Sequence, residues 1–171
     1  MAIESKTIVL GIDPGTAILG YGAVAIEGEA LEAVDFGVLT TPASLPLTSR
    51  LLFLFEGLAK IIDRIHPAEV AVEQLFFSRN VRSAFAVGQA RGVALLAAAR
   101  GGLPVSEYTP QQVKQAVAGY GKATKLQVQS MVQVMLSLQQ LPYPDDAADA
   151  LAIAICHARW NAAMGAGRVS L

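Results

Sequence analysis

The chain has 171 residues, of which 53% are hydrophobic and 16% charged, and its formal net charge at pH 7 is −1. This composition excludes intrinsic disorder, and the length suits a single domain, residues 1–171, with a sizeable core. The lone Cys156 excludes an internal disulfide or a thiolate metal cluster, and the near-zero net charge argues at first against a nucleic-acid-binding protein.

The first third of the chain is predicted to form three strands and a helix. "KTIVLGI" is a β-branched run that reads as a buried strand ending at Asp13, and "GYGAVAIEG" and "ALEAVDFGVLT" follow as two more strands. After the loop "TTPASLP", apolar residues at spacings of three, four and seven predict a helix that Pro67 ends. These apolar residues are Leu51, Leu54, Phe55, Leu58, Ile61, Ile62 and Ile65.

Strands and helices then alternate along the chain. "EVAVEQ" predicts a fourth strand, and an Ala-rich helix follows from about residue 81 to 100, where "GGLP" stops it. "PVSEY" predicts the fifth strand, and Pro110 opens a helix that ends at about Ala118.

Two helices complete the chain. One covers about 124–138, and the last begins near Asp145 and runs past Trp160. The Gly- and Ala-rich tail after about residue 164 is expected to be flexible. An antiparallel start followed by βαβ units implies an α/β fold with a mixed five-stranded sheet flanked by helices.

Four acidic residues are predicted to lie at one edge of this sheet. Asp13 ends the first strand and Glu73 the fourth, so their side chains meet if the two strands are parallel neighbours. Asp146 and Asp149 share one face of the last helix, and the two alanines between them allow close approach to the sheet. Taken singly, each acid also fits an ordinary role as a turn, cap or edge residue.

Such a group of carboxylates favours a divalent metal. Converging acids repel one another and would take up protons unless a cation were present, and Mg²⁺ prefers oxygen ligands. No Cys or His pattern suits zinc. His157 lies roughly 12 Å along the helix from Asp149, too far to share its metal, and His66 is expected to be an ordinary surface residue.

The charges are unevenly distributed along the chain. Residues 1–73 hold four basic and ten acidic side chains, whereas residues 74–125 hold seven basic side chains against Glu107 alone. The seven are Arg79, Arg82, Arg91, Arg100, Lys114, Lys122 and Lys125. This basic section suits a polyanionic partner, although a solvated face explains such a run about as well.

Five segments resemble the RuvC family of Holliday junction resolvases, in that family's order and spacing: "GIDPGT", "VEQLFF", "QARGVALLAAA", "QVKQAVAGYGKATK" and "DDAADALAIAICHA". The resemblance implies a ribonuclease H-like fold and a symmetric homodimer. It further implies metal-dependent cleavage of four-way DNA junctions in recombination and repair, leaving 5′-phosphate and 3′-hydroxyl ends. The expected location is the cytoplasm, in association with the nucleoid, and the RuvA–RuvB branch-migration complex is the expected partner.

The resemblance also assigns residues to the reaction. The catalytic acids, which would hold two Mg²⁺ ions with Mn²⁺ as a substitute, fall on Asp13, Glu73, Asp146 and Asp149. Some relatives carry His in place of the acid at 146. Asp145 directly precedes it, and both the shared helix face and the family pattern select Asp146.

Contacts with DNA are implied in the same way. Lys114 and Lys125 match family positions beside the scissile phosphate, and Lys122 lies close enough in sequence to join them. Phe76 matches an aromatic residue that stacks on an unpaired base at the junction centre, and Arg79 and Arg82 are further candidates for phosphate contacts.

Two points stay open from the residues alone. The helix at 81–100 carries small residues on two faces, and nothing in the sequence decides which face packs on the sheet and which meets a dimer partner. The faces comprise Ala84, Gly88 and Gly92, and Ala86, Ala90 and Ala94. A ribonuclease H-like nuclease that processes RNA, and a junction-binding protein without catalysis, are the alternative functions.

Overall fold

A mixed five-stranded sheet organises the computed structural model, which describes residues 6–75 and 80–166. The strands follow the order β3-β2-β1-β4-β5. The first three pair antiparallel, β4 is parallel to β1 and β5 is parallel to β4. Their bounds are β1 (Thr7–Asp13), β2 (Ile18–Glu27), β3 (Ala30–Thr40), β4 (Glu69–Glu73) and β5 (Val105–Tyr108). The predicted α/β architecture is confirmed.

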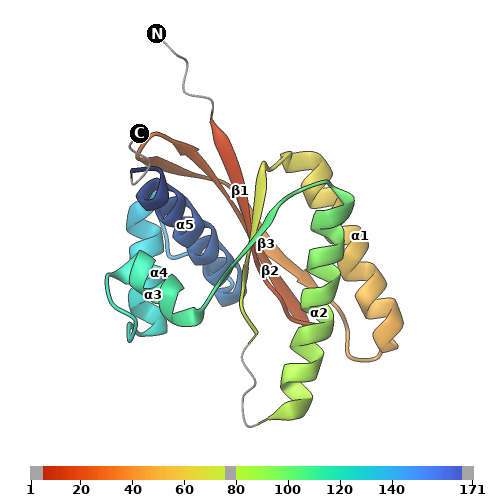
Figure 1. Cartoon of the computed structure of the whole chain (residues 1–171). Coiled ribbons are helices and arrows are strands. Elements are labelled where there is room, and N and C mark those ends of the chain that lie inside the picture. Colours follow the sequence, from red (N-terminus) through yellow and green to blue (C-terminus); the bar gives the residue numbers. More distant parts are fainter. Residues whose placement is uncertain (1–5, 76–79, 167–171) are drawn as a thin grey trace.

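Helices cover both faces of the sheet (Figure 1). One face carries α1 (Leu47–Ile65) and α2 (Val81–Arg100), and the other carries α3 (Pro110–Ala118), α4 (Lys125–Met135) and α5 (Asp145–Ala166). Side chains alternate between two cores, since Val9 of β1 packs in the core that contains α5, whereas Leu10 and Ile12 pack in the core that contains α1 and α2.

The helix ends follow local chemistry, with one difference from the prediction. α1 ends at Ile65, and its C-cap His66 is an exposed residue in the left-handed conformation directly before Pro67. α4 ends at Met135 rather than at about residue 138. The chain turns there because Ser137 has a φ of 51° and the N–H of Leu138 donates to a carbonyl one turn back in α4.

Glycines let α5 lie directly on the sheet. A Cβ atom at Gly11 would stand 2.1 Å from the carbonyl oxygen of Ala150, and one at Gly20 would stand 2.0 Å from the carbonyl oxygen of Asp146. No side chain tolerates such distances, so only glycine permits this approach. These contacts fix how close the first turns of α5 lie to β1 and β2.

The middle of α5 is buried. Between Ala147 and Ala158 every residue is buried except Asp149. Cys156 is fully buried, and burial raises the pKa of its thiol to about 12. Within the described ranges, no helix is both long enough and apolar enough to cross a membrane.

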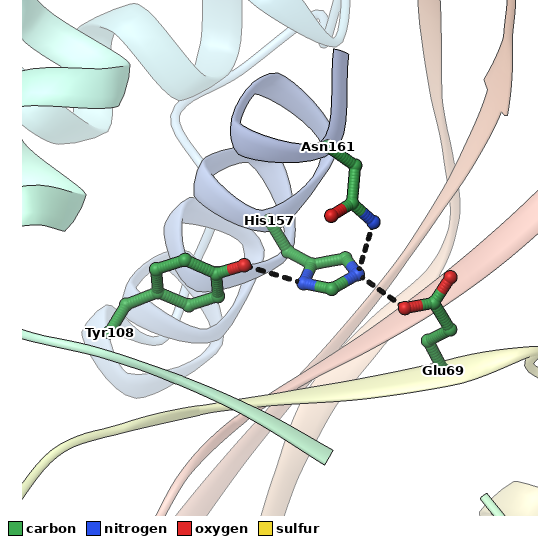
Figure 2. A network of polar contacts seen from close by, with 4 residues as sticks. All are labelled: Glu69, Tyr108, His157 and Asn161. Atoms are coloured by element: carbon green, nitrogen blue, oxygen red, sulfur yellow. Dashed lines mark hydrogen bonds and ion pairs between the residues drawn. The ribbon is translucent and has the colours of Figure 1, made fainter. Parts of the chain in front are cut away.

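A polar network ties the second half of α5 to the sheet (Figure 2). Nδ1 of His157 lies 2.8 Å from the hydroxyl of Tyr108 in β5, and Nε2 lies 2.8 Å from a carboxylate oxygen of Glu69 in β4. The amide nitrogen of Asn161 lies 2.9 Å from the same Nε2. His157 is 1% exposed, and both of its ring nitrogens have polar partners. This histidine therefore has a structural role.

Candidate active site

Asp13 and Glu73 meet at the carboxyl ends of two parallel strands. Ile12 of β1 stands opposite Val72 of β4, so the residue that follows each of them lies at the same edge of the sheet. Side chains of a β-strand alternate between the two faces of the sheet, so Asp13 points to the same face as Val9, four residues earlier in β1. Val9 packs in the core that contains α5, and both acids therefore point toward the face that α5 covers. The parallel pairing inferred from the sequence thus brings these two acids together.

Asp146 is brought to the same edge by backbone contact. Gly20 is the register partner of Asp13 across β1 and β2, and the backbone of Asp146 packs on Gly20. Asp149 follows one turn later on α5 and is half-buried. Figure 1 shows the beginning of α5 at the end of the sheet where β4 finishes.

The acids act on one another electrostatically. Burial raises the pKa of Asp13 from the ordinary 3.8 to about 8. The charge of Asp149 is the second cause of this rise, followed by those of Glu73 and Asp146. Burial and then the charge of Asp149 raise the pKa of Glu73. Burial also raises the pKa of Asp149, against the opposing charge of Lys125. Asp13 therefore lies close enough to the other three carboxyl groups for their charges to act on it.

The donor set of this site fits a hard divalent cation. Carboxylate oxygens are the ligands that Mg²⁺ and Mn²⁺ prefer, and a cation would relieve the repulsion that raises the pKa of Asp13. In residues 6–75 and 80–166, no three acidic, histidine or cysteine side chains already stand around a common metal position. Instead, the ammonium group of Lys125 neutralises part of the site.

Two lysines border the acids. Lys125, in the first turn of α4, places Nζ 3.2 Å from Asp149 and 3.3 Å from Asp145. Lys114 of α3 acts on Glu73, since its charge lowers the pKa of that carboxyl group against the effect of burial. Both lysines line a cavity of about 250 Å³. Its full lining is Glu73, Pro110, Val113, Lys114, Lys125, Val128, Asp149 and Ala152.

The other predicted DNA-binding residues lie outside this cavity or outside the described residues. Lys122 is exposed in the loop between α3 and α4, and Arg82 is exposed in the first turn of α2. Neither lines the cavity just described. Phe76 and Arg79 lie outside the described residues. A larger cavity, of about 530 Å³, lies beside Glu69 at the opposite end of β4 and contains none of the predicted site residues.

The sequence did not point to Gln129 as part of the site, and it gave Asp145 no role of its own. Gln129 is 9% exposed, and its amide nitrogen donates to Asp145 at 3.0 Å. Asp145 was considered only as a competitor of Asp146. The spacing of Gln129 four residues after Lys125 was the available signal, because such residues share a helix face.

Comparison with known proteins agrees with this geometry. Residues 9–157 match the family model described as "Crossover junction endodeoxyribonuclease RuvC". The protein of that name from Desulforamulus reducens is 56% identical over 162 residues, covering 95% of this chain and 99% of the relative. The one from Chloroflexus aggregans is 62% identical over 149 residues, covering 87% and 91%.

Solved structures extend the likeness to three dimensions. "T. thermophilus RuvC in complex with Holliday junction substrate" matches with a TM-score of 0.87 and 41% identity, covering 93% of this chain and 96% of that one. A yeast mitochondrial Holliday junction resolvase shares the fold, with a TM-score of 0.69 and 14% identity over 97% of this chain and 85% of that one. The predicted ribonuclease H-like fold is confirmed. Because the family model spans most of the chain and the relatives match at nearly full length, the protein belongs to the RuvC family of crossover junction endodeoxyribonucleases.

Proposed function

We propose that this protein is an endonuclease that resolves Holliday junctions by paired, symmetric cuts on opposing strands, in homologous recombination and DNA repair. The observation that carries the proposal is the convergence of Asp13, Glu73, Asp146 and Asp149 at one edge of the sheet, in a chain of the RuvC family. The relative from T. thermophilus was solved with a Holliday junction substrate, which supports four-way DNA as the substrate here.

The acids are proposed to hold two Mg²⁺ ions, for which Mn²⁺ can substitute. When bound, such ions activate an attacking water and stabilise the leaving oxygen of a phosphodiester. The chain's own contribution is to keep the carboxylates at the sheet edge with little solvent, where Asp13 binds a proton readily until a cation replaces it. The products would carry 5′-phosphate and 3′-hydroxyl ends, which a ligase can rejoin.

The basic residues are proposed to hold the DNA. Lys114 and Lys125 line the same cavity as Glu73 and Asp149, so a phosphate there would meet both ammonium groups. Lys122 and Arg82 would contact phosphates farther from the cut. Phe76 is proposed to stack on a base at the junction centre, and Arg79 to contact phosphate. The segment 76–79 follows shortly after Glu73 in the chain.

A homodimer is proposed because two matched cuts require two active sites related by a two-fold axis. The surface of α2 that faces away from the sheet supports this assembly. Val81, Phe85 and Leu96 are 72%, 69% and 59% exposed, whereas Ala90 and Ala94 are buried in the core that contains α1. Joint action with the RuvA–RuvB complex, in the cytoplasm at the nucleoid, completes the proposal.

Cleavage of a synthetic four-way junction tests the function. In Mg²⁺, the protein should introduce nicks at symmetric positions in two opposing strands, and it should leave linear duplex DNA of the same sequence largely intact. Preferred cleavage of an RNA substrate would instead indicate an RNA-processing nuclease. Tight junction binding without nicks in either Mg²⁺ or Mn²⁺ would indicate a binding protein without catalysis.

A further inference from the structure

Asp145 lies just outside the group of four acids and has its own partners. It is the first residue of α5, and its side chain is 59% exposed. Each of its carboxylate oxygens faces a residue of α4. Oδ1 accepts a hydrogen bond from Gln129 at 3.0 Å, and Oδ2 lies 3.3 Å from the ammonium group of Lys125. Asp145 therefore joins α5 to two positions that lie one turn apart on α4.

Gln129 fixes the position of this carboxylate. Its side chain is almost fully buried, and a buried amide that lost its partner would cost free energy. Holding the bond to Asp145 avoids that cost. Because the buried amide of Gln129 donates to its carboxylate, the side chain of Asp145 has less conformational freedom than a fully solvated aspartate at a helix start.

The backbone of Lys125 is fixed as well. Thr124 is the N-cap of α4 and accepts a hydrogen bond from the N–H of Gln127, whose side chain bonds back to the N–H of Thr124. The hydroxyl of Tyr120 donates to the same Gln127 side chain at 2.6 Å. These hydrogen bonds hold the backbone of Lys125 in the first turn of α4. The long side chain of Lys125 can still move, so the position of its ammonium group depends on the acidic residues that it contacts.

Asp149 alone is a poor anchor for that ammonium group. Under the proposed function Asp149 binds a divalent cation, and two cations on one carboxylate repel each other. Asp145 does not belong to the proposed metal-binding group, so its charge stays available to Lys125 throughout the reaction.

We infer that Asp145, held by Gln129, is a positioning residue that keeps the ammonium group of Lys125 in the cavity beside Asp149, where a substrate phosphate would bind. This inference rests on the proposed function and adds a residue to it. A surface acid without such a role makes a different prediction for cleavage, because removing a negative charge near bound DNA does not slow the cleavage step.

The test combines Asp145→Asn, Lys125→Met and the double variant on a synthetic four-way junction in Mg²⁺. Asp145→Asn should slow single-turnover cleavage about two- to fivefold, the range for loss of an exposed ion pair. Junction binding without divalent metal should be equal or tighter. In the Lys125→Met background, Asp145→Asn should cause no further slowing, because its effect passes through Lys125. Glu29→Gln, an equal charge change in the exposed turn after β2, is the control and should cleave at the normal rate.

A second readout does not depend on cleavage. In the metal-free protein, the NMR signal of the Lys125 side chain should shift in Asp145→Asn and stay in place in Glu29→Gln. An unmoved Lys125 signal, or equal slowing by Asp145→Asn with and without Lys125, would overturn the inference. Failure of the wild-type protein to cut the junction would contradict the proposed function instead, and the NMR measurement would still decide the role of Asp145.

Discussion

Asp13 shows how burial and charge act together on one side chain. It ends a buried strand, has the carboxylates of Glu73 and Asp149 near it, and has a pKa of about 8. Burial is the largest cause, so the fold itself makes the charged form of this residue costly. Placing it there weakens the fold, and the proposed metal ion would relieve the repulsion between the acids.

This predicts that the metal-free protein loses stability as the pH rises. The folded-state pKa of Asp13 is raised, so the folded protein holds the proton more tightly than the unfolded chain. The stabilisation that comes from the tighter proton binding of Asp13 in the folded protein is complete below pH 3.8. It is lost progressively as the pH rises to about 8. Urea unfolding at pH 5 and pH 8 in EDTA should show the loss, and Asp13→Asn should reduce it. A free energy of unfolding for the wild type that rises over this interval, or an unchanged dependence in Asp13→Asn, would contradict the explanation.

At the scale of elements, the close contact of α5 with β1 and β2 builds the site. Gly20 stands opposite Asp13 and touches the backbone of Asp146, so one residue without a side chain sets the separation of two catalytic candidates. Gly11 repeats the contact farther along β1, against the backbone of Ala150. The position of the acids is therefore a property of helix-on-sheet packing.

Gly20→Ala is expected to displace the beginning of α5. The added methyl group would overlap the carbonyl of Asp146 and cost about 1–3 kcal/mol, the usual range for overpacking. Urea unfolding should measure this loss, and junction cleavage should fall more than binding. Gly37→Ala is the matched control, because its methyl group would meet only the movable ring of Tyr21 at 3.0–3.3 Å. Equal effects of the two substitutions would show that the close approach at Gly20 does not matter.

The elements also show which features a sequence can predict. The bounds of β1, α2 and α3 follow from local signals, namely a β-branched run, a Gly-Gly stop and a Thr-Pro start, and the structure has them where these signals predict. The early end of α4 and the partners of Lys125 depend on contacts between separate elements. Helical spacing puts Gln129 on the same face of α4 as Lys125, but it does not show that Asp145 of α5 lies opposite that face, so the contact was missed.

At the scale of the whole molecule, the two faces of the sheet have different tasks. The face with α3, α4 and α5 supplies the acids and two lysines, whereas the opposite face ends in the exposed apolar residues of α2. This separation would let two copies associate through α2 while both active sites stay open to one junction.

Phe85→Glu should therefore prevent dimer formation. A charge in the middle of an apolar interface is costly to bury, so sedimentation should show a monomer for Phe85→Glu and the proposed dimer for the wild type. Paired cuts on one junction should be lost with the dimer. Val134→Glu on α4, which removes an apolar side chain of nearly equal exposure (68% against 69%), is the control and should stay dimeric. A dimeric Phe85→Glu protein would place the interface elsewhere.

The variant Glu73→Gln determines whether four acids from β1, β4 and α5 act as one metal-dependent site. This substitution keeps the size of the side chain and removes one carboxylate. Single-turnover cleavage of a four-way junction in Mg²⁺ should be abolished, as it should be for the wild type in EDTA, while junction binding stays within about twofold of the wild type. Cleavage at the normal rate by Glu73→Gln would show that the four acids do not act as one metal-dependent site.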